Sequence, residues 1–578
     1  MGKAIRFLLM SVFFVAPALA QDRMAPANLP PNTMFYAYWR GLGSQAQLNQ
    51  VNSLLGLWND PDFLPFRAAL AESILRNSEQ KDPRKQLTPA DLQEIASILE
   101  NPILFGAVQP SKPLAAASAE QKMKANSEDD TFFVVDTSGK EALLLKLEQR
   151  WAESATDAPV ITKFTIGDIP AEKVVTKTST SFRASAGHYF VRAGSRVLLE
   201  RVLARVTGPD AKGSQLGEVA EFREAQKTIE PGSLVEIFFR VPNLADFVPP
   251  GVAQTPQFNG KGFVQGLHLD SLHAMAGCLK LNGAFTRMRF NILGDPAPGG
   301  PLDLFGSGDA PFTALSLAPA DAVSFSSFQV NFGAFYETLR RALVSSLPAN
   351  MQGNVDMFEG MAASQIGMKP LEALQLLTGE IATVSTGTDF APEDDLFALG
   401  IQNKPDVLRL LRSVMGDRVS NERVAGDVTY MKISLSGTQG AAGVAEWNFY
   451  YLAATPHLLL GSRKNETLQA AVARAKVSGS ASSGGLAAQP AFLQARSKFP
   501  QRVNSLGYAN FRRINWSQVR DRLVSEAQKA GAGKSAKPDV TIERLKQLDF
   551  SVFGRHLHTL ASASWKDSSG VSWDAYIE

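Results

Sequence analysis

The sequence predicts an α+β fold made of two similar units in tandem, each with a mainly antiparallel sheet and packed helices. Two observations predict it. Strand-like segments such as 190–193 and 444–451 alternate in polarity, which indicates sheets with one wetter face and helices on the other. Similar segments also recur in the same order in the two halves. With 578 residues, of which 45% are hydrophobic, the chain has enough apolar material for large cores.

The internal repeat starts with a strand that follows a proline. The segment 29–38 resembles 317–328, and each of them leads into a helical pattern. The further matches keep this order and pair 131–135 with 395–399, 190–196 with 458–463, 222–227 with 492–498, 234–239 with 505–510, and 269–292 with 556–577. Several matches in the same order are stronger evidence for a repeat than any single match is. The alternative is two unrelated α+β domains in which strands and helices follow one another in the same common order.

The unit boundaries follow from segments that break regular structure. The run Gly294-Asp-Pro-Ala-Pro-Gly-Gly300 disfavours both helix and strand. We therefore expect a first unit over 29–293, a linker over 294–312 and a second unit over 313–578.

The first twenty residues have the features of a signal peptide. Lys3 and Arg6 precede an apolar run over 7–15, and Ala18-Leu19-Ala20 has the small-x-small pattern of a cleavage site. The run is shorter than the ~20 residues that a membrane-spanning helix needs. The alternative is an uncleaved anchor. We expect an exported protein, periplasmic or extracellular, with residues 1–20 as signal peptide and no transmembrane span in the mature chain.

Composition excludes several function classes. Lys and Arg number 58 and Asp and Glu 56, so loss of Lys3 and Arg6 with the leader leaves a formally neutral mature chain. Such a chain has no basic excess for nucleic acid. A single cysteine, Cys278, excludes a disulfide framework and a cysteine-based zinc site, and its apolar context indicates a buried, inert thiol.

Histidines are the metal-ligand candidates of the sequence. His556 and His558 are two residues apart, so on a strand both rings would share a face, and His273 occupies the corresponding segment of the first unit. Two imidazoles with a carboxylate such as Asp270 or Asp549 could hold a divalent ion. The alternative, which we favour, is a strand position with a half-buried ring and no metal.

Acidic and aromatic clusters supply the other candidates. The acids of 128–130 and 393–395 each precede an apolar strand, where they could act as a general acid and base or simply form a turn. The turn is the commoner role, so the sequence assigns no catalytic residue and no cofactor. An apolar groove for a lipid, peptide or partner protein could be lined by aromatic residues near the junction of the units, namely Phe238, Phe239, Phe247 and Phe263. The alternative is that these rings are core.

Several segments together resemble a family of uncharacterised exported bacterial proteins catalogued as a domain of unknown function. The resemblance rests on the proline-led opening strand, Leu377-Thr-Gly-Glu380, the hairpin that ends at Gly461-Ser-Arg463, and Phe492 leading to 505–510. It implies long α+β units and is weaker in the first unit, where Leu99-Glu-Asn-Pro102 lacks the Gly-Glu pair. It implies no activity, ligand or functional residue.

Together these features favour a non-catalytic binding or envelope-associated structural component, with an unidentified protein, peptide or lipid partner. The alternative is a hydrolase that acts on envelope material, with the strand histidines as the candidates to hold a catalytic metal. A role as an enzyme stays open, and the sequence leans against it.

Overall fold

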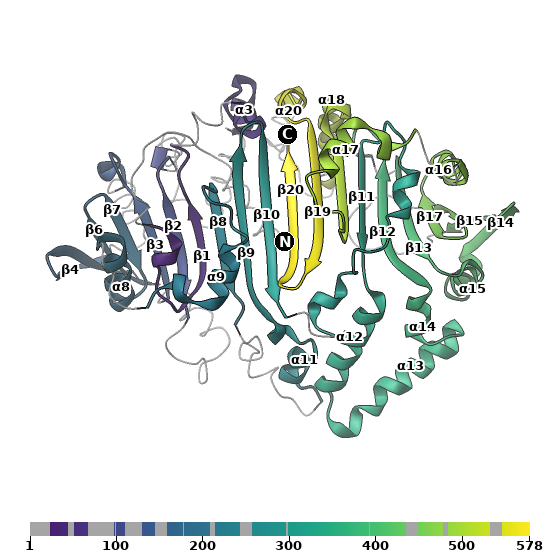
Figure 1. Ribbon diagram of the computed structural model, residues 1–578, viewed down its shortest axis with the longest axis horizontal. Coiled ribbons are helices and arrows are strands. Elements are labelled where there is room, and N and C mark those ends of the chain that lie inside the picture. The colour runs from purple at the N-terminus through teal and green to yellow at the C-terminus, as the bar shows by residue number, and fades with distance from the viewer. Residues whose placement is uncertain are drawn as a thin grey trace. The chain divides into compact units, whose positions relative to one another are not determined.

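Figure 1 shows the computed structural model of the chain, in which helices and strands confirm the expected α+β class. The structure describes residues 24–43, 51–67, 97–98, 100–109, 130–144, 159–176, 179–208, 214–242, 257–295, 299–391, 394–434, 449–477, 484–531 and 546–578. The expected signal peptide over 1–20 lies outside these residues. Among them, no helix has both the length and the apolar character that crossing a bilayer requires.

The chain divides into two compact units. The first comprises Met1–Asn243 and Leu272–Leu293, and the second comprises Leu244–Ser271 and Gly294–Glu578. The expected first unit ended at 293, but residues 244–271 within it group with the second unit, as does the expected linker over 294–312. Close helix packing explains the first grouping. A Cβ on Gly266 of α11 (Gly260–Gly266) would lie 2.5 Å from the Cα of Ala342 in α12 (Phe332–Ser346), so the missing side chain permits the contact.

The first unit contains an antiparallel sheet with the strand order β4-β5-β6-β7-β3-β2-β1-β8-β9-β10. The strands are β1 (Thr33–Trp39), β2 (Ile103–Val108), β3 (Thr131–Asp136), β4 (Val160–Ile166), β5 (Ile169–Val175), β6 (Thr180–Ala186), β7 (Tyr189–Ala193), β8 (Val235–Arg240), β9 (Leu272–Asn282) and β10 (Phe285–Gly294). Its described helices are η1 (Pro26–Asn28), α3 (Ser53–Asn59), η2 (Pro61–Phe63), α8 (Arg196–Thr207), η3 (Leu216–Glu218) and α9 (Ala220–Gln226).

The second unit contains an antiparallel sheet with the order β14-β15-β16-β17-β13-β12-β11-β18-β19-β20. This is the strand order of the first sheet, taken strand for strand. The strands are β11 (Ser324–Gln329), β12 (Leu377–Ser385), β13 (Asp395–Ile401), β14 (Val419–Ala425), β15 (Val428–Ser434), β16 (Phe449–Ala454), β17 (Leu458–Ser462), β18 (Ser505–Asn510), β19 (Thr559–Asp567) and β20 (Gly570–Ile577).

The helices of the second unit include those that flank its sheet and those that connect its strands. Besides α11 and α12, they are η5 (Leu269–Ser271), η6 (Pro301–Leu304), η7 (Thr313–Leu317), η8 (Ala349–Met351), α13 (Gly353–Ile366), α14 (Pro370–Gln375), α15 (Lys404–Met415), η10 (Gly416–Arg418), α16 (Asn465–Val477), η11 (Leu486–Ala488), α17 (Pro490–Arg496), η12 (Phe511–Arg513), α18 (Trp516–Gly531) and α20 (Ser551–His556).

Local sequence explains where the longer helices begin. The Ser195 hydroxyl accepts a hydrogen bond from the backbone N–H of Leu198 and caps α8. Asn403 caps α15 in the same way, and Pro405 at the first turn has the backbone angle a helix needs. Both helices follow directly on a strand of the sheet, so each packs back against it.

The main core of the first unit lies between the sheet and helices α8 and α9 (Figure 1). The Tyr36 and Phe238 rings stack with centroids 5.7 Å apart, and Phe222 of α9 meets Phe238 edge-on at 5.4 Å. All of these residues are fully buried. In the second unit, Phe492 of α17 packs edge-on against Tyr508 of β18 at 5.4 Å, which is the corresponding helix–strand contact.

A buried carboxylate joins η7 to the second sheet. Glu380 of β12 is 4% exposed and accepts hydrogen bonds from the backbone N–H groups of Thr313 and Ala314, both at 3.0 Å. The Ser327 hydroxyl of β11 donates to it at 3.1 Å. Burial raises the pKa of Glu380, and these hydrogen bonds oppose that shift. The carboxylate therefore satisfies donors that would otherwise be buried without an acceptor.

We expect Glu380→Ala to lower the free energy of unfolding by about 2–4 kcal/mol, because buried backbone and hydroxyl donors lose their acceptor. Glu337 on α12 is exposed and provides the matched control, for which Glu337→Ala should cost under about 0.5 kcal/mol. Urea unfolding of both variants measures the difference. Equal losses in the two variants would contradict a structural role for Glu380.

Candidate functional site

The second sheet has one face covered by helices and one face with exposed aromatic rings. In β11, Phe325 is 1% exposed and lies on the side of η7, whereas Phe328 is 42% exposed. Successive strand residues point to opposite sides, so Phe325 and Phe328 lie on different faces of the sheet. The side that carries Phe328 is the candidate site.

Strand register places further apolar residues beside Phe328. Phe328 pairs with Ile381, Ile381 with Leu399, and Leu399 with Leu459. Phe397 is two residues from Leu399, so it shares their face, and it is 45% exposed. We call these residues the open face: Phe328, Ile381, Phe397, Leu399 and Leu459. At its Leu459 end, the open face is partly covered by α15.

The positions interleaved with the open face are small or hydroxylated. By register and alternation they are Ser326, Thr383, Gly461, Ser505 and Gly507. None of them carries a charge, so the surface formed with the open face suits an uncharged, apolar molecule.

A charged cluster lies on the same side, next to Phe397. Asp395 is two residues before Phe397, and Arg463 is two residues after Gly461, so alternation brings both onto this side of the sheet. Burial raises the pKa of the Asp395 carboxyl, the neighbouring Asp394 carboxylate raises it further, and Arg463 and Arg522 oppose the shift. Arg522 belongs to α18, one helical turn after Gln518, which accepts a hydrogen bond from the Thr388 hydroxyl at 3.4 Å.

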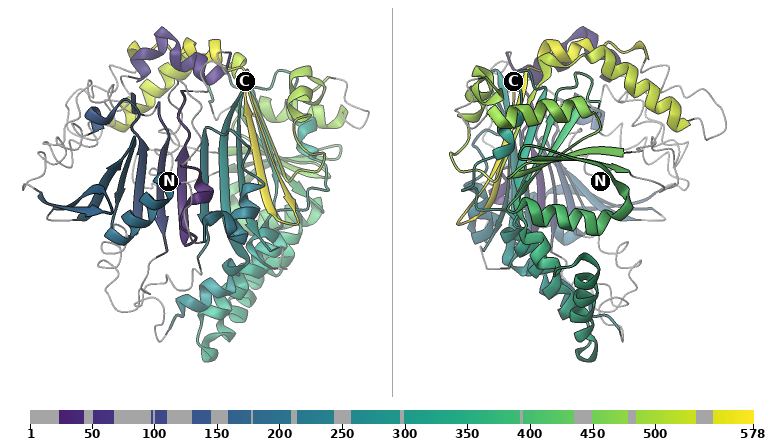
Figure 2. Two further views of the ribbon diagram at one scale, coloured as in Figure 1. Left: turned by 60° about the vertical axis from the view of Figure 1, so that its left-hand side comes forward. Right: turned by 90° about the vertical axis from the view of Figure 1, so that its right-hand side faces the viewer.

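Helix α18 is held against the connection between β12 and β13. The backbone N–H of Asn515 donates to the Thr388 carbonyl at 2.7 Å, and Trp516 meets Phe390 edge-on at 6.5 Å. Trp516 also packs on Phe553 of α20 at 5.0 Å. Figure 2 shows α18 extending from this anchored start away from the strands. Phe390 is 43% exposed and has a positive φ of 59°, a strained conformation for an aromatic residue.

The first sheet carries a similar but less exposed set of rings. Phe105 pairs with Ala37 on one side and Phe133 on the other, and Phe35 pairs with Phe239. Phe35 and Phe105 contact edge-on at 6.0 Å. Phe105 is 36% exposed and its neighbours are half-buried, so less apolar surface is accessible here than on the open face.

The structure separates the aromatic residues that the sequence singled out as groove candidates. Phe238 is fully buried in the core, so its assignment to a groove was wrong, and the core alternative holds for it. Phe239 follows it directly and therefore lies on the other face, half-buried. Phe263 is half-buried on α11, in the second unit, and Phe247 lies outside the described residues. Sequence analysis missed Phe328 and Phe397, although the alternation in β11 and β13 could have signalled them.

The two C-terminal metal-ligand candidates do not lie on a strand, which corrects the prediction. His556 ends α20, and β19 begins only at Thr559, after His558. The aromatic packing of Phe553 on Trp516 stabilises a helical turn where alternation was expected. Burial lowers the pKa of His558, and nearby Arg512 lowers it further. His273 lies in β9 of the first unit. Throughout the described ranges, no group of His, Cys, Asp and Glu is arranged to hold a metal ion.

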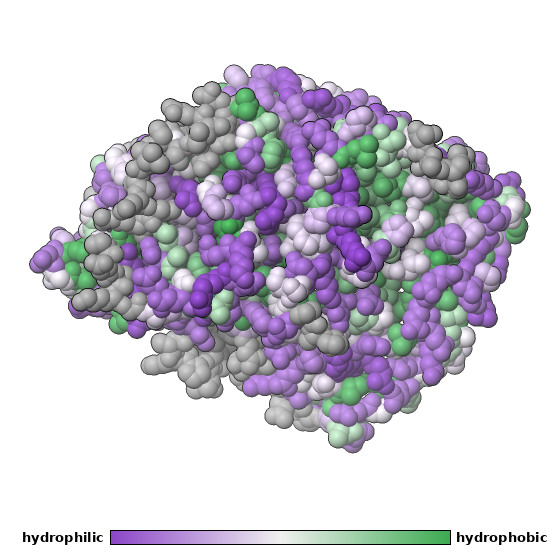
Figure 3. All heavy atoms as spheres, viewed as in Figure 1, coloured by the Kyte–Doolittle hydropathy of each residue, from purple (hydrophilic) through white to green (hydrophobic). Residues whose placement is uncertain are grey.

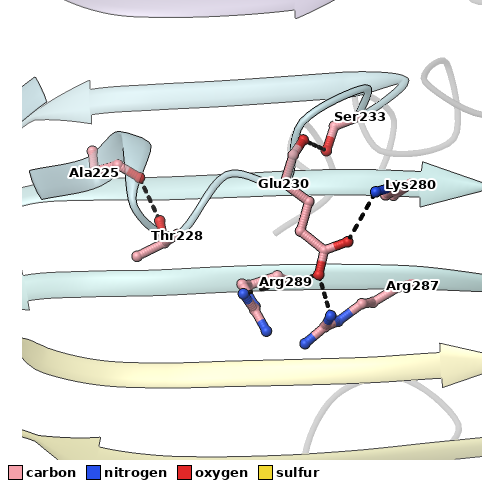
Figure 4. A network of polar contacts seen from close by, with 7 residues as sticks. All are labelled: Ala225, Thr228, Glu230, Ser233, Lys280, Arg287 and Arg289. Atoms are coloured by element: carbon pink, nitrogen blue, oxygen red, sulfur yellow. Dashed lines mark hydrogen bonds and ion pairs between the residues drawn. The ribbon is translucent and has the colours of Figure 1, made fainter. Parts of the chain in front are cut away.

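A polar network in the first unit has a structural role (Figure 4). Glu230, just after α9, pairs with Arg287 and lies 3.5 Å from the Lys280 ammonium and 4.0 Å from Arg289. The network thereby connects the loop after α9 to β9 and β10. Cys278 lies nearby, 8% exposed, and burial raises the pKa of its thiol, as expected for an inert cysteine.

A shallow polar cavity of about 410 Å³ lies elsewhere in the second unit, between 308–312 and 496–503. The Arg496 guanidinium donates to the carbonyls of Phe499, Pro500 and Gln501, and Arg502 pairs with Asp309 at 2.9 Å. These cations hold the loops that form the cavity. On the side of the molecule drawn in Figure 3, hydrophilic residues predominate and apolar ones form smaller patches among them.

Comparison with known proteins gives little to add to the geometry. No family model and no curated protein matches the chain. A solved structure entitled crystal form III of TP0453 is 14% identical, with a TM-score of 0.24, and the match covers 47% of this chain and 80% of that one. Crystal form I of TP0453 is 12% identical, with a TM-score of 0.22, over 48% and 81%. TM-scores this low carry no argument about fold or function.

We expect Asp395→Asn to stabilise the protein relative to wild type more at pH 7.5 than at pH 4. A carboxyl whose pKa is raised by folding contributes stability below its unfolded pKa and loses that contribution as the pH rises through its folded pKa. Melting temperatures of both proteins at the two pH values measure this change. Asp417→Asn, at an exposed position, serves as the control for the substitution itself. A benefit of Asp395→Asn that shrinks as the pH rises would contradict the assignment.

Proposed function

We propose that the protein is a non-catalytic binding protein that holds a long apolar chain, such as the acyl chain of a lipid, on the open face of its second sheet. The observation that carries this proposal is the alignment of exposed Phe328 and Phe397 with Ile381 and Leu399 across neighbouring strands. Single exposed apolar side chains are common on protein surfaces, but a contiguous apolar patch is a sign of binding.

The chemistry of the surface favours an acyl chain over a peptide. The residues between the open-face side chains are small and uncharged, so they offer few side-chain groups that could recognise polar peptide side chains. The backbone N–H and C=O groups of β11, β12 and β13 are already hydrogen-bonded to neighbouring strands, so a peptide cannot add as a strand there. An alkyl chain requires only apolar contact.

The rival function, an envelope-acting hydrolase, has no specific observation in its favour. Asp394, one of the acids considered for catalysis, is ion-paired with Lys464 at 2.5 Å. The pKa of Asp395, its neighbour, responds to the charges of Asp394, Arg463 and Arg522. This arrangement supports an electrostatic role for the pair.

We further propose that the two units arose by duplication of one ancestral unit. The identical strand order of the two sheets supports this proposal, since unrelated α+β domains rarely share a full strand order. The equivalent helix–strand contacts of Phe222 with Phe238 and of Phe492 with Tyr508 support it further.

We propose export to the periplasm or the extracellular space, on the basis of the charged, apolar and small-residue pattern of 1–20. Expressed in a bacterium with a general secretory pathway, the mature protein should begin at Gln21 by intact mass. An Ala20→Arg variant should remain uncleaved because the small-residue site is lost. A wild-type protein that keeps Met1 in the cytoplasmic fraction would contradict export.

The neutral fluorescent probe N-phenyl-1-naphthylamine tests the apolar site. We expect Phe397→Ser to weaken its binding about tenfold, because a lost ring contact removes on the order of 1.5 kcal/mol. Folding should be nearly unaffected, since Phe397 is 45% exposed. Fluorescence titration measures the affinity and circular dichroism the fold.

The matched control is Leu493→Ser on α17, which is 53% exposed and belongs to the helices rather than the open face. It should leave probe binding unchanged. If Leu493→Ser weakens the probe as much as Phe397→Ser does, or if neither does, the open face is not the binding site. Co-purification of a protein without lipid would instead indicate a protein partner.

A further inference from the structure

One end of the open face carries charged residues. Along β13 from Leu399 through Phe397, the next residue on the same side is Asp395, the first residue of the strand. Helix α18 lies beside the loop that precedes β13, because the Thr388 hydroxyl donates to Gln518, one helical turn before Arg522, at 3.4 Å. The step from Leu399 to Asp395 spans about 14 Å at the ~3.4 Å rise of an antiparallel strand. This is a length that a long alkyl chain covers. The site is therefore amphipathic, with an apolar floor and one charged end.

Arg522 retains hydrogen-bonding capacity at this charged end. Its Nε donates to Glu526 of the same helix at 2.9 Å. Its Nη1 atom is buried and has no hydrogen-bond acceptor within the part of the chain that the structure describes. A buried guanidinium donor without an acceptor is costly, and an oxygen of a bound molecule would satisfy it.

The acids near Arg522 have partners of their own. Asp394 is paired with Lys464, and Glu526 occupies only the Nε of Arg522. Burial raises the pKa of Asp395, which means that the site disfavours its negative charge unless cations compensate. Arg463 extends on the same side of the sheet as the second cation of the cluster. An oxygen acceptor that reaches Arg522 Nη1 therefore complements this end, and a carboxylate forms a stronger, charge-assisted hydrogen bond with a guanidinium than a neutral oxygen does.

We propose that the ligand is a long-chain carboxylic acid, whose alkyl chain lies on the open face and whose carboxylate accepts a hydrogen bond from Arg522. This inference rests on the proposed function and adds the chemistry of the head group. Charge complementarity between a carboxylate and an arginine beside an uncharged apolar surface distinguishes a fatty acid from a neutral lipid.

Oleate and oleyl alcohol, which have the same chain and differ in the head group, test the proposal by titration calorimetry on the full mature chain. Arg522→Gln should weaken oleate binding about tenfold and leave oleyl alcohol unchanged, since only the carboxylate uses the guanidinium. Arg522→Lys, which keeps the charge, should retain most of the oleate affinity. Phe397→Ser should weaken both ligands, because both use the open face.

Arg520→Gln is the matched control, since Arg520 is on the same helix and pairs with the adjacent Asp521 at 2.8 Å. It should change neither affinity. The head-group proposal is overturned if Arg522→Gln leaves oleate binding intact or weakens both ligands equally. If wild-type protein binds neither oleate nor oleyl alcohol, the proposed function itself fails together with the inference.

Discussion

The alternation of side chains along a strand is the constraint on which the rest of this structure depends. A strand that is apolar at consecutive positions must present apolar groups on both faces of its sheet. In β13, Leu396 is 1% exposed beneath the helices, and its neighbour Phe397 is 45% exposed on the other side. In β11, Phe325 is likewise buried, and Phe328 is exposed on the other side. Helix η7 covers one face of β11, β12 and β13, whereas α15 covers the other face only at its Leu459 end, so Phe328 and Phe397 stay exposed.

The two faces of the second sheet also differ in where charged side chains lie. The helix-covered face holds a buried carboxylate, Glu380, whose hydrogen bonds bind η7 to the strands and leave it no role in recognition. On the other face, the apolar rows carry no charge, and the nearest charged residue along β13 is Asp395 at the start of the strand. Burying a charge is costly unless it is paired and hydrogen-bonded, and the hydrogen bonds of Glu380 meet that condition.

The sequence alone was sufficient to predict the α+β class, because polarity alternation and turn residues are local signals. It could not place Phe328 beside Ile381 and Leu399, because strand register depends on pairing between residues far apart in the chain. Phe238 and Phe239 illustrate the limit: alternation requires them to face opposite ways, but only the tertiary packing of Phe222 decides which is core. Likewise, His556 completes a helix because Phe553 packs on Trp516, a contact without a local signal.

Phe390, in the loop between β12 and β13, has a strained backbone conformation. An aromatic residue with a positive φ costs free energy, and such conformations persist where surrounding contacts enforce them. Here the hydrogen bond from Asn515 to Thr388 and the Trp516 ring fix the loop between β12 and β13 against α18. Because Arg522 is on that helix, the loop also fixes the position of the guanidinium relative to β13. For the proposed ligand, this means that α18 and the start of β13 are already connected before binding, so the carboxylate contact would require no rearrangement of the loop.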